Sequence, residues 1–469
     1  MKNLDVHFDE AWYAYAKFHP IYEGRFAMGV EEKRTDDLPM LNMPTLFAVQ
    51  STHKMLPAFS MASMIHIKYP ERADVRFDQF NEAFMMHGTT SPFYPMIASI
   101  DVATSMMDEP GGPTMMKETV LDAIGLRKAI ASVAEKYEKK GSQKKDPWFF
   151  GCYQPDKVLH DGNYVDFVDA PDSELATNPN CWKLQRDPDK PDFAWHGFKK
   201  EDLGDDDGYC MLDPTKVTIL CPGINPQGKM SEWGIPGAIL TRFLDSRRIE
   251  IARTGDYTVL VLFSVGSSKG KWGTLLEALM EFKSLYDGGA TLYEVLPELV
   301  AEFPDRYSLK DGNPMTLKDL CQEMHEAMKK SNLPAKLNNA CDKIPQAVLS
   351  PAETYQKLVR NKTELQQIDD DAVGRISGHM LVPYPPGIPI IMPGEPLEQE
   401  HVDLLFELQE FGKDFPGFGR EIHGIEVDGE GNFWMRCVIE DEERVSTAPS
   451  FMLKARPRAV MKSFKKGRS

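Results

Sequence analysis

The chain has 469 residues, of which 42% are hydrophobic and 27% are charged, and its formal net charge is −17. These values are typical of a globular protein with room for about three domains, and the acidic balance argues against nucleic acid as the main partner. No long apolar run occurs and the seven cysteines include no Cys-x-x-Cys pair, so we expect a cytoplasmic protein with no membrane contact, disulfide framework or zinc knuckle.

The first predicted element is a short strand. Residues Leu4 to Phe8 alternate between apolar and polar side chains, which places Asp9 at the carboxyl end of the strand. Ligands bind at this end of the strands in open α/β sheets. Asp9 is therefore a candidate ligand-binding carboxylate, and the alternative is that it caps a helix or a turn.

A second predicted strand, from Pro44 to Gln50, leads into the segment Ser51-Thr52-His53-Lys54, and a third apolar run ends at Ile67. A lysine at a strand end is a candidate for Schiff-base formation, because partial burial and neighbouring charge favour its neutral amine. A solvated loop lysine is the alternative. A pyridoxal phosphate site needs a lysine for the aldehyde and a carboxylate for the pyridine nitrogen, and Lys54 and Asp9 supply both.

Helices follow in the next part of the chain. We predict one helix from Ser91 to Met107, stopped by Pro110-Gly-Gly-Pro113, and a long amphipathic helix from Lys117 to Lys140. The polar stretch from Asp169 to Asp207 is rich in proline and aspartate and is predicted to be irregular.

Strands and helices then alternate. Strands are predicted at Lys216–Leu220, Thr258–Phe263 and Phe433–Ile439, helices at Gly237–Leu244, Thr274–Leu285, Asn313–Lys330 and Pro351–Asn361, and an extended proline-rich loop at Pro383–Pro393. This order favours an α/β fold with a separate α+β domain in the C-terminal third.

Two other patterns are weaker. The loop from Gly266 to Lys271 lies between a predicted strand and a helix, but Trp272 stands where a phosphate-binding loop of a nucleotide triphosphatase needs Ser or Thr. The eleven histidines form no His-Glu-x-x-His pattern, so we expect no catalytic metal. Asp213 and Glu395 are candidates for binding the cationic tail of a substrate, and capping or salt-bridge roles are equally open.

Ordered motifs along the chain are similar to those of a known family. They are Phe8–Tyr15, Phe18–Gly24, Gln50–Lys54, Ala62–His66, Met86–Pro92, Trp148–Phe150, Gln154–Asp156, Trp195–Phe198, Met211–Val217, Pro222–Gly223, Gly270–Thr274, Val382–Pro389, Pro393–Glu395 and Phe415–Phe418. Together they resemble the bacterial ornithine/lysine/arginine decarboxylases, which are pyridoxal-phosphate enzymes of fold type I, over nearly all of the chain.

The resemblance implies roles for individual residues. Lys54 matches the lysine that carries the cofactor, Asp9 the carboxylate that faces the pyridine nitrogen, and Ser51 a hydroxyl near the cofactor phosphate. His53 borders the cofactor and is expected to take part in catalysis with Lys54 and Asp9. Trp12 lies near the cofactor pocket, and Thr89 matches a threonine that reaches the active site of a partner subunit.

The resemblance also implies a fold and its division. We expect a partial fold type I transferase domain with three αβα layers at residues 1–115, a small aminotransferase-like α/β domain at 116–305, and a C-terminal α+β decarboxylase domain at 306–469. Family members carry several hundred further residues before this region, namely a wing domain and the first part of the cofactor domain. A homodimer or higher oligomer is expected, and a separate chain is a candidate supplier of the missing N-terminal part.

The expected reaction is the pyridoxal-phosphate-dependent decarboxylation of arginine or lysine to the amine and carbon dioxide, with ornithine less favoured. The alternative is a catalytically incomplete subunit that needs a partner chain to complete the cofactor site. The net charge of −17 suits a cationic substrate. It also suggests assembly at low pH, as in acid-stress members of the family, because protonated carboxylates repel one another less.

Overall fold

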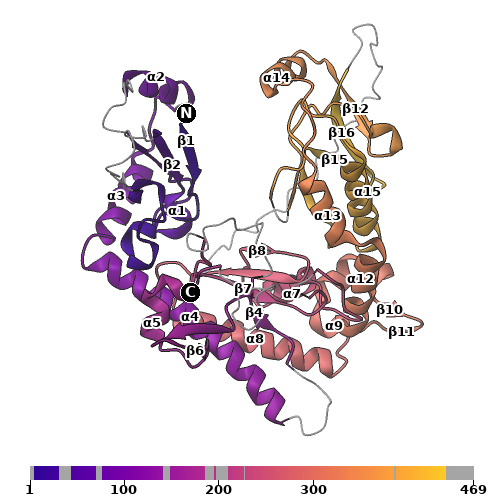
Figure 1. Cartoon of the computed structure of the whole chain (residues 1–469). Helices are drawn as coiled ribbons and strands as arrows, with labels where there is room; N and C mark the ends of the chain where they lie inside the picture. Colours follow the sequence, from indigo (N-terminus) through magenta and orange to yellow (C-terminus); the bar gives the residue numbers. More distant parts are fainter. Residues whose placement is uncertain are drawn as a thin grey trace, which may run out of the picture. The chain divides into compact units, whose positions relative to one another are not determined.

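A computed structural model describes residues 5–30, 44–69, 77–140, 148–184, 195–196, 210–225, 228–384 and 387–439. The chain folds into two compact units, Met1–Lys330 and Ser331–Ser469, whose elements are labelled in Figure 1. In the described residues, no helix is long and apolar enough to cross a membrane.

A three-stranded sheet opens the first unit. Strand β1 (Val6–Asp9) pairs in parallel with β2 (Leu46–Gln50), and β2 pairs antiparallel with β3 (Met64–Lys68). Strand β2 alternates buried and half-buried residues, as expected for a central strand with one face on the core. The predicted strands before Asp9 and before Ser51 are therefore confirmed.

A four-stranded antiparallel sheet lies further along the same unit, in the order β4-β7-β9-β8. Its strands are β4 (Gly151–Cys152), β7 (Lys216–Leu220), β8 (Arg253–Thr254) and β9 (Thr258–Leu262). Val217, Ile219 and Val259 are fully buried, because alternate residues of β7 and β9 face the core. The first unit also contains two separate pairs of strands. One is a hairpin of β5 (Lys157–His160) and β6 (Asn163–Asp166), and the other is a ribbon of β10 (Leu309–Lys310) and β11 (Asn313–Pro314).

Helices connect and cover these sheets. Those of the first unit are α1 (Thr52–Met55), α2 (Phe77–His87), α3 (Tyr94–Met106), α4 (Gly111–Lys140), α5 (Asp172–Thr177), α7 (Gly237–Ser246), α8 (Lys269–Asp287), α9 (Leu292–Val295), α10 (Pro297–Glu302), α11 (Pro304–Tyr307) and α12 (Leu317–Ser331). Short 3-10 turns lie at η1 (Ala16–Phe18), η2 (Pro20–Tyr22), η3 (Ala27–Gly29) and η4 (Pro179–Cys181). The long helix α4 runs beside α8 (Figure 1), and the Trp272 indole of α8 donates to Asp122 of α4 at 3.2 Å.

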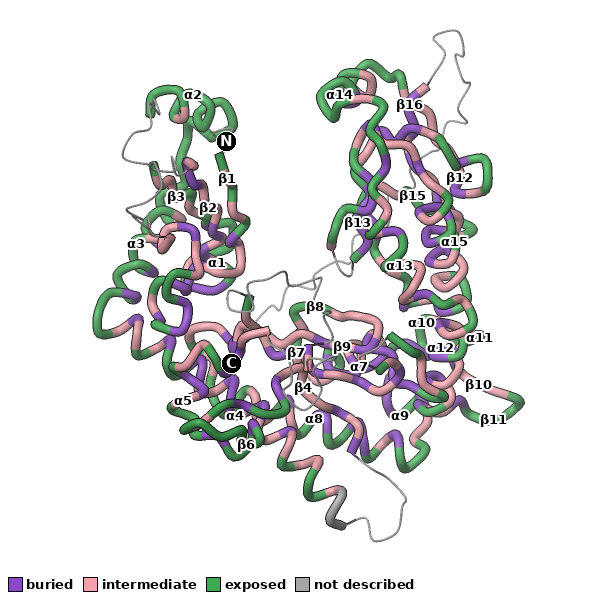
Figure 2. The backbone as a smooth tube through the Cα atoms, viewed as in Figure 1, coloured by how far each residue is buried: buried purple, intermediate pink, exposed green. Residues whose placement is uncertain are grey.

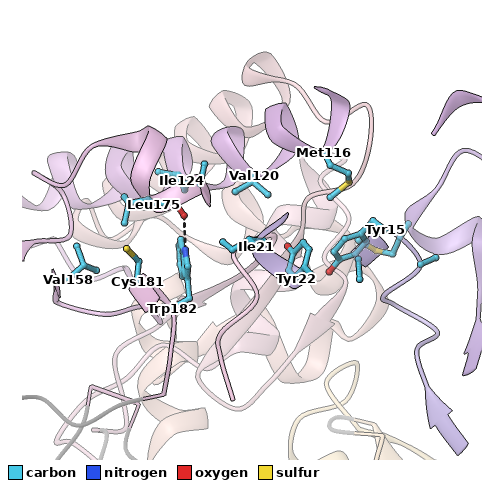
Figure 3. Packing of buried hydrophobic residues seen from close by; sticks show 14 of the residues in the cluster. Tyr15, Ile21, Tyr22, Met116, Val120, Ile124, Val158, Leu175, Cys181 and Trp182 are labelled. Atoms are coloured by element: carbon cyan, nitrogen blue, oxygen red, sulfur yellow. Dashed lines mark hydrogen bonds between the residues drawn. The ribbon is translucent and has the colours of Figure 1, made fainter. Parts of the chain in front are cut away.

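The core of the first unit joins the segment after Asp9 to α4 and α5. Figure 3 shows Tyr15, Tyr22 and Ile21 in a row beside side chains of α4, with Ile21 next to Trp182. The Trp182 indole is fully buried and donates a hydrogen bond of 2.8 Å to the carbonyl of Leu175. The segment that follows Asp9 is thus anchored in the core by large side chains, each of which contributes about 1.5–3 kcal/mol on burial.

The second unit is a small α+β structure. Strands β12 (Thr363–Gln367), β16 (Phe433–Val438) and β15 (Ile425–Val427) form an antiparallel sheet in that order, and β13 (Val382–Tyr384) pairs with β14 (Glu421–His423). The helices are α13 (Leu333–Asp342), α14 (Pro351–Val359) and α15 (Gln399–Asp414), with the turn η5 (Asp370–Ala372). Helix α15 packs against α13 and β16.

Three predicted boundaries were wrong. The segment Pro110-Gly-Gly-Pro113 was predicted to lie between two helices, but α4 begins within it, at Gly111. Proline is tolerated in a first helical turn, where its missing N–H would have no partner in any case. The stretch from Asp169 is not wholly irregular, because residues 172–177 form α5, whose acidic first turn suits a helix N-terminus; residues 185–194 and 197–209 lie outside the described residues.

The third boundary concerns the helix predicted from Asn313. Asn313 and Pro314 belong to β11, and α12 begins only at Leu317. Thr316 and Asp319 fix this start, since the Thr316 hydroxyl accepts from the Asp319 N–H at 3.1 Å and Asp319 accepts from the Thr316 N–H at 3.0 Å. The other predicted strands and helices appear with shifts of a few residues. The division into three domains at residues 115 and 305 stays a prediction.

Candidate active site

Asp9 and Lys54 lie at the same edge of the first sheet. Strands β1 and β2 are parallel neighbours with Asp9 opposite Val49, and α1 starts two residues after β2 and carries Lys54. Because parallel strands end at one edge, both side chains follow carboxyl strand ends. Both residues are exposed, so the edge leaves a carboxylate and an amine open to a ligand.

The contacts of Asp9 are few. Its Oδ1 accepts a hydrogen bond of 3.0 Å from the N–H of Ala11, which closes a tight turn. The turn-capping role weighed for Asp9 is therefore present. One oxygen caps the turn, and the carboxylate keeps further acceptor capacity for a second partner.

Lys54 lies beside an aromatic ring that carries a second cation. Its Nζ is 5.9 Å from the centre of the Trp12 indole, and the guanidinium of Arg253, on β8, is 4.9 Å from the centre of the same ring. Such contacts stabilise a cation by about 0.5–1 kcal/mol at exposed sites. Lys54 forms no ion pair with any carboxylate of the described ranges, so its amine is not committed elsewhere.

Backbone contacts of His53 fix the α1 turn. Its ring Nδ1 lies 2.8 Å from the carbonyl of Ala62, which also accepts from the His53 N–H at 3.3 Å. Ser51 stands at the start of α1 without using its hydroxyl as a cap. The hydroxyl of Thr52 is buried and has no partner in the described part of the chain, so two hydroxyl groups beside Lys54 remain available to a ligand.

Thr89 forms no hydrogen bond with Asp9, Lys54 or Trp12 in the described residues. It is exposed between α2 and α3, and its hydroxyl accepts from the Ser91 N–H at 3.1 Å. This contact is local. The role of Thr89 toward a partner subunit stays a prediction.

Glu10 is a site residue that sequence reasoning missed. It is 5% exposed, and its two carboxylate oxygens accept from the Ala27 N–H at 2.6 Å and from the Gln50 side-chain amide at 2.8 Å. Gln50 is the last residue of β2, so Glu10 ties the carboxyl ends of β1 and β2 together. The alternation of the strand could have indicated this. Consecutive residues of a strand point to opposite faces, so Glu10 points inward if Asp9 points outward.

Asp213 has the salt-bridge role weighed for it, because groups of the chain itself surround its carboxylate. It accepts from the hydroxyl of Tyr15, from that of Tyr22 at 2.9 Å, and from the Lys216 ammonium at 2.6 Å. Burial raises the pKa of Asp213, but the Lys216 charge and these hydrogen bonds outweigh it, so the pKa lies below its ordinary value. Burial and the Asp213 charge raise the pKa of both tyrosines. Glu395 caps a local turn, with Oε2 2.7 Å from the Met392 N–H.

Arg127 on α4 is a second buried charge that the sequence did not reveal. Its guanidinium is fully buried, and it donates to the carbonyl of Tyr153 at 2.9 Å and to those of Lys216 and Pro214 at 3.1 and 3.5 Å. It also lies 5.3 Å from the centre of the Trp182 ring. Burial lowers the pKa of Arg127 to about 10. Arg127 holds the backbone that carries Asp213 and Lys216.

No group of three or more potential metal ligands lies together in the described residues. The groups gathered at the sheet edge are an amine, a carboxylate, two hydroxyls and an indole. They suit a ligand with an electrophilic carbon, a basic nitrogen and a planar ring.

Comparisons of the sequence with known proteins all identify the same family. Residues 1–271 match the family described as "Orn/Lys/Arg decarboxylase, major domain", and residues 334–439 match the C-terminal domain of the same family. The chain is 40% identical over 438 residues to the biodegradative arginine decarboxylase of Escherichia coli, with 92% of this chain and 54% of that protein covered. It is 41% identical over 441 residues to a lysine decarboxylase of Pseudomonas aeruginosa, covering 93% of this chain and 53% of that protein.

Solved structures give the same result. Lysine decarboxylase A from Pseudomonas aeruginosa matches with a TM-score of 0.78 at 38% identity, over 92% of this chain and 53% of that one. The constitutive lysine decarboxylase of Escherichia coli matches with a TM-score of 0.75 at 37% identity, over 92% of this chain and 54% of that one. The chain thus has the fold of these proteins and spans about half of their length.

Proposed function

The chain belongs to the Orn/Lys/Arg decarboxylase family, whose members depend on pyridoxal phosphate, and from this premise we propose that it carries the decarboxylation of arginine or lysine. The observation that supports this most is that Asp9 and Lys54 both follow the carboxyl ends of the paired strands β1 and β2.

The side chains at this edge fit the cofactor. Lys54 offers the amine for its aldehyde, Asp9 a carboxylate for its pyridine nitrogen, and the hydroxyls of Ser51 and of the unpartnered Thr52 offer donors for its phosphate. Trp12 is half-buried, and its indole lies beside the Lys54 amine. Bound pyridoxal phosphate supplies an electron sink for the pair left when carbon dioxide departs.

Three residues of the chain have defined roles in this proposal. Lys54 holds the cofactor, for which its amine must be neutral, and returns a proton in the course of turnover, for which the amine must be protonated. Asp9 keeps a proton on the pyridine nitrogen by stabilising the cationic form. His53, fixed by the Ala62 carbonyl, borders the cofactor and orients the α1 turn.

The proposed substrate is a basic amino acid. Identity to arginine and lysine decarboxylases is almost equal, at 40% and 41%, whereas it falls to 30% for the constitutive ornithine decarboxylase of Escherichia coli. Arginine and lysine are therefore favoured over ornithine. The acidic chain, with a net charge of −17, supports a cationic substrate, and seven free cysteines support a reducing, cytoplasmic location.

A second candidate is a subunit that needs further polypeptide to complete its site. Helices α2 and α3 expose many apolar side chains, and α2 has no buried residue at all (Figure 2). Those more than 40% exposed are Phe77, Phe84, Met85, Met86, Tyr94, Ile97, Val102 and Met106, together with Phe93 just before α3. An apolar surface of this extent is typical of a contact region, and the chain spans about half of its curated relatives.

The test is a direct assay. The purified chain, given pyridoxal phosphate, is incubated with arginine, lysine and ornithine in turn, and the amine product is measured. We expect product from arginine or lysine, none from the Lys54→Ala variant, and an unchanged rate from Lys17→Ala, which alters an exposed lysine of η1. If the chain alone is inactive but gains activity with the polypeptide encoded directly upstream, the second candidate holds. Inactivity in both settings contradicts both.

A further inference from the structure

Lys216 links two parts of the first unit through one ammonium group. Its Nζ donates to Asp213 Oδ2 at 2.6 Å, to the hydroxyl of Tyr15, and to the backbone carbonyl of Trp12 at 3.2 Å. The same ammonium faces the rings of Tyr13 and Tyr15, at 5.7 and 4.9 Å from their centres. Lys216 opens β7, and Trp12 is 204 positions earlier in the chain.

The Lys216 side chain has little freedom. It is 22% exposed and its partner Asp213 is 16% exposed. Asp213 is itself held by Tyr22 at 2.9 Å and by the Thr215 hydroxyl at 2.7 Å. Arg127 fixes the carbonyl of Lys216 from the other side at 3.1 Å. A charge surrounded by this many partners keeps one position.

Trp12 is the point where this network meets the candidate site. The Ala11 N–H donates to Asp9 and the Tyr13 N–H donates to the Glu10 carbonyl at 2.8 Å, so Trp12 lies in the turn that starts at Asp9. Holding the Trp12 carbonyl holds this turn. The indole of the same residue lies beside Lys54.

We propose that Lys216 is a positioning residue for this site: it holds the Trp12 backbone so that the indole stays beside Lys54 and the turn presents Asp9 toward it. This deepens the proposed function and rests on it. A displacement of about 1 Å at a reacting group can cost about 100-fold in rate, so a turn on an exposed edge needs such an anchor. An ammonium with three donors suits three acceptors in different directions better than a planar guanidinium does.

The test compares two lysines that each pair with a carboxylate. Lys216→Met removes the anchor, and Lys283→Met is the matched control. Lys283 is 1% exposed, pairs with Asp287 and lies 4.7 Å from the centre of the Phe149 ring, and its described contacts do not include Trp12. Both variants lose one ammonium with a carboxylate partner, so a general loss of stability affects both.

The first measurement needs no cofactor. Acrylamide quenching of Trp12 is obtained as the difference between each protein and the same protein carrying Trp12→Phe. We expect the Trp12 quenching constant to rise toward that of an exposed indole in Lys216→Met and to stay at the wild-type value in Lys283→Met. If Lys216→Met does not fold, Tyr15→Phe is used, because it removes one hydroxyl of the network without changing a charge.

The second measurement is the pyridoxal phosphate concentration that half-saturates borohydride labelling of the Lys54 peptide. Loss of a hydrogen bond from a charged group predicts a rise of about tenfold in Lys216→Met, a smaller rise in Lys216→Arg, and no change in Lys283→Met. Unlabelled Lys54 in the wild-type chain contradicts the proposed function, and the quenching result then decides on Lys216 alone. Equal quenching in Lys216→Met and Lys283→Met overturns the positioning role.

Discussion

Two arrangements of aspartate and lysine each include a lysine in contact with Trp12, and they differ in how their charges are partnered. Asp9 and Lys54 are exposed, with one local hydrogen bond on the carboxylate and an indole beside the amine. Asp213 and Lys216 are largely buried and pair with each other at 2.6 Å. The same residue types thus serve different ends, because a buried, satisfied pair holds structure while an open pair remains available for chemistry.

The largest expected effect separates the two aspartates by stability. Asp213→Asn should lower the free energy of unfolding by about 3–5 kcal/mol, since it leaves the largely buried Lys216 charge without its carboxylate partner. Asp9→Asn should change it by less than about 0.5 kcal/mol, as is usual for exposed positions. Urea unfolding followed by circular dichroism measures both. Equal losses in the two variants would contradict the contrast between the pairs.

The second effect separates the two aspartates by turnover. In the active protein, Asp9→Asn should lower kcat by about 100- to 1000-fold, the usual cost of removing one preorganised electrostatic group. Asp5→Asn is the control, because Asp5 is exposed and precedes the opposite end of β1. Product formation with a saturating basic amino acid measures the change. If Asp9→Asn turned over as fast as Asp5→Asn, the assignment of Asp9 to the active site would be contradicted.

The third effect concerns the tie between the two strand ends. Glu10→Ala should destabilise the chain by about 1–3 kcal/mol, because the Ala27 N–H and the Gln50 amide lose their buried acceptors. Glu10→Gln should cost less, since it retains one acceptor oxygen. Unfolding midpoints in urea give the order. A Glu10→Ala midpoint equal to that of wild type would mean that this carboxylate does not hold β1 and β2 together.

The smallest effect is the response of the buried pair to pH. The pKa of Asp213 is lowered in the folded chain, so its contribution to stability is present above the ordinary aspartate pKa and is lost as the pH falls through the folded value. The difference in unfolding free energy between wild type and Asp213→Asn should therefore shrink on acidification. A series of urea titrations from neutral pH downward checks this. A difference that stays constant or grows in acid would contradict the assigned pKa direction.

Much of the site edge could be predicted from local patterns. Alternation before Asp9 and the apolar run before Ser51 marked two strands, and their carboxyl ends did fall at one edge of a parallel pair. Local periodicity also gave β7 and α8, because buried strands and amphipathic helices repeat at fixed intervals. The chemical roles of Asp9 and Lys54 rest on family resemblance and stay predictions.

The supporting residues could not be predicted in this way. Glu10 meets Gln50 across 40 positions and Lys216 meets Trp12 across 204, so no local pattern records either contact. Arg127 gave no signal at all, since an arginine in an amphipathic helix is expected to face water, yet it is fully buried in the fold. Tertiary contacts alone decide which charged side chains become buried anchors.

The most direct test of the account is the identity of the residue that holds the cofactor. The chain is loaded with pyridoxal phosphate, reduced with borohydride, digested and mapped by mass spectrometry. We predict the reduced label on the peptide that contains Lys54 and its loss in Lys54→Ala. A label on another lysine, or labelling that persists in Lys54→Ala, would contradict the assignment of the Asp9–Lys54 edge as the active site.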